Sequence, residues 1–137
     1  MIRRRKRLRA RVLLAAGARE VRSSIATALR GDGHEVVEFG DGATLLAQVR
    51  YDLMRGLSGD GCLVIAGQRT SIFTGLEVLT RLRKAASATA CVIVNAGDDP
   101  RLRSAARRLG ATAVLEALDV ELLRATARRV ASHRPAV

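Results

Sequence analysis

The sequence predicts an α/β fold in which a five-stranded parallel sheet is flanked by helices, a flavodoxin-like (βα)5 three-layer αβα sandwich. Five short apolar runs alternate with five segments whose apolar residues recur at helical spacing, which is typical of βαβ units. The 137 residues suit one domain with its own core, because 48% of them are hydrophobic. Right-handed crossovers between parallel strands then place helices on both faces of the sheet.

The apolar runs are rich in Val, Ile and Leu, as strands buried on both faces are. Only 2% of the residues are aromatic, so aliphatic side chains must fill the core. A buried parallel strand usually presents functional groups where it ends, but the third run, CLVIAG, ends at Gly67. We expect strands over residues 12–16, 35–39, 62–66, 91–94 and 112–115.

The helical segments carry local start and stop signals. Thr74 and Glu77 have the spacing of a capping box, Asp99 followed by Pro100 is typical of a helix start, and Gly110 is a stop signal. The residues expected to face the core are Val21, Ile25, Ala28 and Leu29; Leu45, Leu46, Val49 and Leu53; Leu76, Leu79 and Leu82; and Leu122, Leu123, Thr126, Ala127 and Val130.

The formal net charge of +11 is concentrated at the two ends of the chain. Residues 1–11 carry seven basic side chains and no acid, residues 12–100 are nearly balanced, and residues 101–137 carry eight basic and three acidic side chains. Cys62 and Cys91 fall in apolar strands, which favours free thiols in a reducing compartment. With no signal peptide and no apolar run of about 18 residues, we expect a cytoplasmic protein without a membrane span.

Four segments together resemble, in order and spacing, the receiver domain of bacterial response regulators, the CheY-like domain. They are VLLAAGAREVRSSIATALRGDGHEVVEFGDG, LVIAG with TGLEVLTRLR after it, VIVNAGDD, and LGATAVLEALDVELL. The resemblance spans nearly the whole chain and implies the flavodoxin-like fold. It divides the sequence into a basic arm over residues 1–11, a receiver-like domain over 12–132 and a tail over 133–137.

The residues that carry the chemistry of that family are missing here. In the family, an aspartate after strand three accepts a phosphoryl group, two acids hold Mg²⁺, and a hydroxyl, a lysine and an aromatic switch residue complete the site. By resemblance these positions fall on Gly67, on Ala16 and Gly17, and on Ala96, Ala117 and Val114. Glycine and alanine supply neither a nucleophile nor a Mg²⁺ ligand. The sequence therefore resembles a degenerate pseudo-receiver that is not an enzyme and needs no metal or cofactor.

Other polar residues near the strand ends have plainer interpretations. Asp98 and Asp99 could bind a cation, but a capped helix start explains them better. His34 is interpreted as a surface residue in a turn. Glycines 17, 67 and 97 could instead leave space for a ligand's phosphate, although no Gly-rich phosphate motif follows the first strand.

Basic residues gather in two places that could contact partners. The resemblance implies that the fourth helix, fifth strand and fifth helix form a face used for dimerisation or protein docking. Its candidate residues are Arg101, Arg103, Arg107, Arg108, Val114, Arg124 and Arg128. The arm could contact nucleic-acid phosphates, anionic lipid or an acidic protein, through Arg3, Arg4, Arg5, Lys6, Arg7, Arg9 and Arg11.

Three functional hypotheses follow from this pattern. The first is a phosphorylation-independent signalling adaptor that works by protein–protein contacts, as a homodimer or with a regulatory partner. The second is an accessory nucleic-acid-binding protein that uses the arm and the arginine-rich face. No aromatic residue lies among the arm's basic residues and no DNA-reading module follows, so such contacts would be non-specific. The third is the N-terminal regulatory domain of a longer protein.

Overall fold

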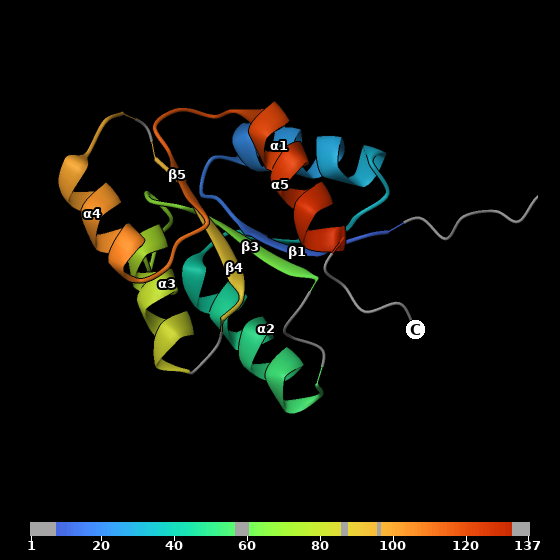
Figure 1. The fold of residues 1–137 in the computed structure, drawn as a ribbon, viewed down its shortest axis with the longest axis horizontal. Helices are drawn as coiled ribbons and strands as arrows, with labels where there is room; N and C mark the ends of the chain where they lie inside the picture. The colour runs from blue at the N-terminus through green and yellow to red at the C-terminus, as the bar shows by residue number, and fades with distance from the viewer. Residues whose placement is uncertain (1–7, 57–60, 86–87, 96, 133–137) are drawn as a thin grey trace, which may run out of the picture.

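The computed structural model describes residues 8–56, 61–85, 88–95 and 97–132 of the chain. Strands and helices alternate throughout (Figure 1). In chain order the elements are β1 (Arg11–Ala15), α1 (Arg19–Gly31), β2 (Glu35–Phe39), α2 (Gly42–Met54), β3 (Cys62–Gly67), α3 (Gly75–Lys84), β4 (Ala90–Val94), α4 (Pro100–Arg108), β5 (Ala113–Leu115) and α5 (Val120–Ser132).

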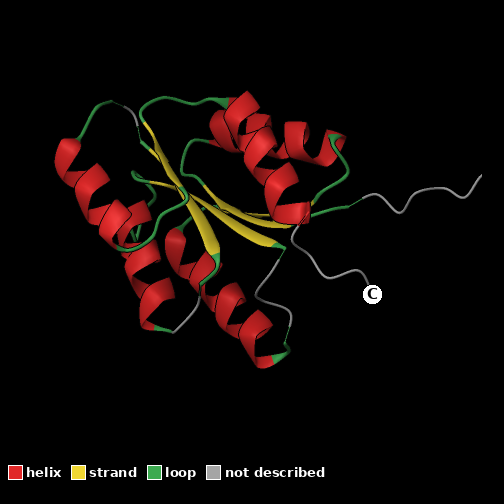
Figure 2. Ribbon diagram, in the orientation of Figure 1, coloured by secondary structure: helices red, strands yellow, loops and turns green. Residues whose placement is uncertain are grey.

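The five strands form one parallel sheet in the order β2-β1-β3-β4-β5. Figure 2 shows this sheet between two layers of helix. Helices α1 and α5 contact each other on one face, and α3 contacts both α2 and α4 on the other. The three-layer αβα prediction is confirmed, and each strand begins within one residue of its predicted start.

Alternating side chains of the central strands build a separate core on each face. On β1, Leu13 packs toward α2 and α3, whereas Leu14 packs toward α1 and α5. On β3, Val64 packs in the same core as Leu13, and Ile65 packs in the same core as Leu14. The side chains of all four residues are fully buried. Both cysteines are buried and outside any disulfide, as predicted. Within the described residues, no helix is long and apolar enough to cross a membrane.

The predicted helix signals are confirmed. The Thr74 hydroxyl accepts the backbone N–H of Glu77 at 3.2 Å, and the Glu77 carboxylate accepts that of Thr74 at 3.3 Å. Asp99 accepts the N–H of Leu102 at 3.1 Å at the start of α4. Gly110 follows α4 with a φ of 73°, a conformation that glycine adopts without strain.

Two predicted core positions are wrong, because their side chains lie outside the buried stripe that most of the other predicted residues of each helix form. Leu53 of α2 is 38% exposed, and Leu122 of α5 is 41% exposed. On α2 the inward position after Val49 is taken by Asp52, which is 1% exposed. A carboxylate thus occupies a place where the periodicity of the sequence favoured a leucine.

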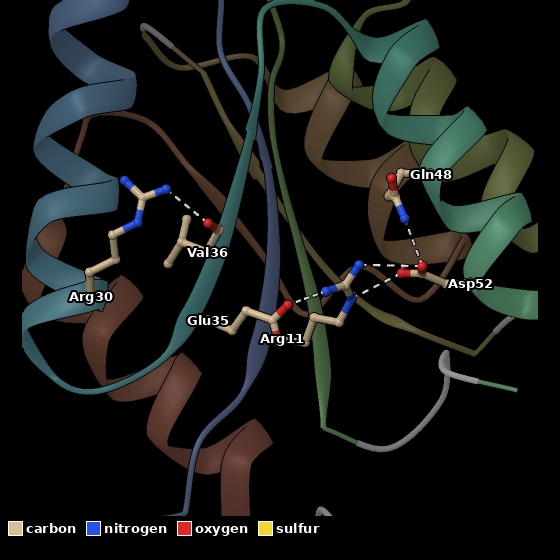
Figure 3. A network of polar contacts seen from close by, with 6 residues as sticks. All are labelled: Arg11, Arg30, Glu35, Val36, Gln48 and Asp52. Carbon is tan, nitrogen blue, oxygen red and sulfur yellow. Dashed lines mark hydrogen bonds and ion pairs between the residues drawn. The ribbon is translucent and has the colours of Figure 1, made fainter. Parts of the chain in front are cut away.

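Asp52 is buried because Arg11 reaches it from β1 (Figure 3). The Arg11 guanidinium donates to both carboxylate oxygens, from Nε at 3.0 Å and from Nη2 at 3.3 Å, and Nη1 donates to Glu35. Gln48 donates a further hydrogen bond to Asp52 at 2.8 Å. The prediction that Arg11 belongs to the arm is therefore corrected: it is the first residue of β1, and its charge is bonded within the domain.

We predict that Asp52→Ala lowers the free energy of unfolding by about 3 kcal/mol or more, because it leaves the partly buried Arg11 guanidinium without its main acceptor. Urea unfolding followed by far-UV circular dichroism measures this. Glu20→Ala, at an exposed acid, is the control and should stay within about 0.5 kcal/mol of the wild type. A cost for Asp52→Ala no larger than that of the control would contradict a structural role for the pair.

His34 is also corrected, since it is 5% exposed rather than a surface residue. Its Nδ1 accepts the backbone N–H of Ala10 at 2.9 Å, which places the imidazole proton on Nε2. Nε2 is buried and has no hydrogen-bond partner among the described residues. Burial lowers the pKa of His34, with Asp32 acting against the shift and Arg128 adding to it. The neutral imidazole therefore links the segment before β1 to the turn before β2.

We predict that acidification below about pH 6.5 destabilises the fold through His34. Below the ordinary histidine pKa the unfolded chain binds a proton that the folded imidazole does not, so stability falls toward acid by at most about 1.4 kcal/mol per pH unit. Chemical unfolding at pH 7.5 and pH 5.5 measures it. His34→Asn keeps an acceptor for Ala10 and should lose this part of the pH dependence, whereas an unchanged dependence in that variant would contradict the assignment.

Candidate functional site

The carboxyl ends of the central strands meet at one edge of the sheet. In the strand register Ala15 of β1 lies beside Ala66 of β3, Gly67 lies beside Val94 of β4, and Val94 lies beside Leu115 of β5. Four of the positions singled out by the resemblance, Ala16, Gly17, Gly67 and Ala117, line one cavity at this edge. Of the other two, Ala96 lies outside the described residues, and Val114 lies on β5.

At the end of β3, backbone and a hydroxyl surround Gly67. A Cβ added there would lie 3.1 Å from Thr70 Oγ1, 3.6 Å from the Ala15 carbonyl oxygen and 3.7 Å from Ala16 Cα. The Thr70 hydroxyl donates to the Gly67 carbonyl at 2.6 Å and is buried. A side chain at Gly67 would thus require the Thr70 hydroxyl to shift by a few tenths of an ångström, and none of these neighbouring atoms is a carboxylate oxygen.

Two amides of this edge hold the loops in place. The Gln68 side chain accepts the N–H of Leu76 at 2.9 Å at the start of α3. The Asn95 side chain donates to the Gly97 carbonyl at 3.2 Å after β4. Sequence reasoning passed over both residues, because a lone amide at a strand end carries no distinctive spacing.

Arg103 of α4 forms ion pairs with acidic residues of two neighbouring loops. Its Nη1 pairs with Asp98 at 2.5 Å and also with Glu116, which follows β5. Asp99 caps α4, as predicted, rather than standing beside Asp98 as a ligand pair. In the part of the chain that the structure describes, no three His, Cys, Asp or Glu residues are placed to hold a metal ion.

The cavity at the edge has a volume of about 480 Å³. Val21 of α1 and Leu118 of the loop between β5 and α5 both line it, and Leu118 is 40% exposed. Leu14 and Ile65 also line it, and both are fully buried. Most of its lining is therefore apolar.

Of the candidate docking residues on α4, β5 and α5, some are exposed and others are bonded within the chain. Arg101, Arg107 and Arg108 of α4 and Arg128 of α5 are exposed. Val114 is half-buried on β5, which is an edge strand of the sheet. The prediction for Arg103 needs correction, because Asp98 and Glu116 already hold its guanidinium.

Arg124 is likewise bonded within the chain. It donates to both carboxylate oxygens of Asp32, from Nε at 2.8 Å and Nη2 at 2.7 Å, and from Nη1 to Glu121 at 2.9 Å. This hydrogen bonding lowers the pKa of Asp32 and raises that of Arg124. Arg124 therefore ties α5 to the end of α1, a partner 92 residues away that no local pattern reveals.

Of the arm, the structure describes only residues 8–11, the part next to the sheet. Arg9 is exposed, and Arg11 is bonded to Asp52 and Glu35. The predicted contact residues Arg3, Arg4, Arg5, Lys6 and Arg7 lie outside the described residues.

Comparison with solved structures identifies the architecture. The chemotaxis response regulator CheY4 of Vibrio cholerae superimposes with a TM-score of 0.72 at 22% identity, over 88% of this chain and 98% of that chain. The receiver domain of the putative response regulator NarL from Mycobacterium tuberculosis gives 0.74 at 22% identity, over 92% and 98%. The fold is that of CheY-like receiver domains. A CheY-like receiver domain protein from Methanospirillum hungatei gives 0.74 at 16% identity, over 90% and 95%.

The likeness lies in structure rather than in sequence. No protein-family model and no curated protein matches the sequence. Each of these three neighbours is described as a response regulator or its receiver domain, and at 22% identity or less the likeness to them shows the fold.

Proposed function

We propose that this chain is a pseudo-receiver, a non-enzymatic signalling adaptor that acts without phosphorylation through protein–protein contacts. Its docking surface, which we call the arginine face, consists of the exposed residues Arg101, Arg107, Arg108 and Arg128 with the edge strand β5. A homodimer or an acidic regulatory protein would suit this surface.

The observation that carries the proposal is the chemistry of the edge cavity. Phosphoryl transfer to a receiver needs a carboxylate nucleophile and a Mg²⁺ ion held by oxygen ligands. Ala16, Gly17 and Gly67 have no side-chain oxygen, and the carboxylate of Glu116 is paired with Arg103. The described residues of this cavity do not fit a Mg²⁺ site, which supports a fold that signals by another route.

The charge of the arginine face supports docking to an acidic surface. Arg101 and Arg108 are seven residues apart and so lie on the same side of α4, two turns from each other. Neither has an ion-pair partner among the described residues. Exposed guanidinium groups are suited to recognising carboxylates and phosphates.

We predict that acetyl phosphate with Mg²⁺ adds no phosphoryl group to the protein, as measured by intact-protein mass spectrometry. Gly67→Asp should also remain unmodified, because it restores a nucleophile without metal ligands. A receiver that has the family's aspartate serves as the positive control for the reagent. A phosphoryl adduct on any carboxylate of the wild-type chain would overturn the proposal.

We predict that Arg101→Glu combined with Arg108→Glu abolishes self-association or stoichiometric capture of the protein partner at about 150 mM salt, where weak ionic contacts are screened. Sedimentation velocity of the purified protein tests the homodimer, and affinity capture tests the partner. Arg50→Glu is the control, since it makes the same charge change at an exposed position of α2.

Fluorescence anisotropy of a labelled DNA duplex distinguishes the alternative. Binding to phosphates should fall steeply as salt rises, whereas the adaptor complex should survive moderate salt. Tight duplex binding at about 150 mM salt that is lost on removing residues 2–7, which leaves β1 and the Ala10–His34 hydrogen bond intact, would favour the nucleic-acid hypothesis over the adaptor.

A further inference from the structure

We propose that the cavity at the carboxyl edge of the sheet binds a small organic anion, a molecule with an apolar body and one acidic head group. This goes beyond the adaptor role and does not depend on it. The cavity occupies the place where the resemblance expects phosphoryl chemistry, but its lining suits a different kind of ligand.

The cavity lies at a point in the topology where ligands commonly bind. In open α/β sheets, ligands bind beyond the carboxyl ends of the strands at the point where the strand order reverses. With the order β2-β1-β3-β4-β5, that point lies between β1 and β3. Ala15 and Ala16 at the end of β1 and Gly67 at the end of β3 line the cavity, so it opens at this point.

The cavity also has the size and polarity of a small-molecule site. A volume of about 480 Å³ lies within the range of small-molecule sites, which are mostly apolar with a few polar groups. Val21, Val94 and Leu118 supply half-buried or exposed apolar surface around it. A strongly hydrated phosphate or metal ion would find few oxygen or nitrogen partners here, whereas an aromatic or aliphatic body would displace water from apolar walls.

The charge of Arg69 indicates which head group the ligand would carry. Arg69, directly after β3, lines the cavity, and no hydrogen bond or ion pair joins its guanidinium to another described residue. Glu116 lines the cavity too, but its carboxylate is paired with Arg103. Among the described lining residues Arg69 therefore leaves a positive charge to be neutralised, which favours an anion.

The cavity also has a physical connection to the rest of the domain. Glu116 and Leu118 belong to the loop between β5 and α5, and Glu116 bonds Arg103 on α4. A ligand that packs against Leu118 would contact the loop that adjoins the arginine face.

The test uses two fluorescent probes with the same aromatic body. 8-Anilino-1-naphthalenesulfonate carries a sulfonate, and N-phenyl-1-naphthylamine lacks it. The chain has no Trp, so protein emission does not interfere with the titrations. We expect saturable 1:1 binding of the sulfonate probe to the folded protein, with amide shifts in NMR spectra confined to residues that line the cavity.

Gly17→Phe should block the cavity and weaken binding of both probes at least about tenfold. A Cβ at Gly17 meets only the Arg69 carbonyl oxygen, at 3.7 Å, so the substitution fits the backbone. Gly31→Phe is the matched control, because it adds the same side chain at the far end of α1 with nothing within 4 Å. Ala117→Phe enlarges a different lining residue and replaces Gly17→Phe should that variant not fold.

Arg69→Gln tests the head group separately. It should weaken the sulfonate probe about fivefold and leave the neutral probe unchanged, because only the sulfonate interacts with the guanidinium charge. Equal affinity of both probes in the wild type would overturn the preference for an anion. Undiminished binding in both blocking variants, or shifts spread over the whole domain, would overturn the site itself.

Discussion

The whole structure depends on burying both faces of β1 and β3 at the centre of the sheet. Their alternating side chains form two cores, one under α1 and α5 and one under α2, α3 and α4. Parallel strands covered in this way must cross over through helices, so all their carboxyl ends lie at one edge. The position of the edge cavity is thus a consequence of the topology.

The chemistry of this edge of the sheet depends on the few side chains that project from it. Ala16, Gly17 and Gly67 line apolar space at this edge and carry neither a charge nor a side-chain oxygen. The charged side chains nearby therefore determine the electrostatics of the edge. Arg103 draws Asp98 and Glu116 together, whereas Arg69 remains available to a ligand. The proposals for this edge accordingly rest on recognition rather than on phosphoryl transfer.

The helix starts and the strand pattern were predictable because their causes are local. Thr74 and Glu77 are three residues apart, and Asp99 caps a helix that begins at the next residue. His34 was predicted at the surface because its polarity and the glycine before it suggested a turn. Its burial depends on Ala10, which lies 24 residues away and supplies the N–H that the imidazole accepts.

The sequence by itself determined the element order, the fold class and the absence of reactive side chains at Gly67 and its neighbours, because these are properties of residue type and spacing. Only the tertiary structure decided which charges are available. Arg11, Arg103 and Arg124 resemble other basic residues in the sequence, yet each pairs with acids that the fold brings to it. An ion pair depends on distances across the folded chain, so its partners become known only when the helices and strands have packed.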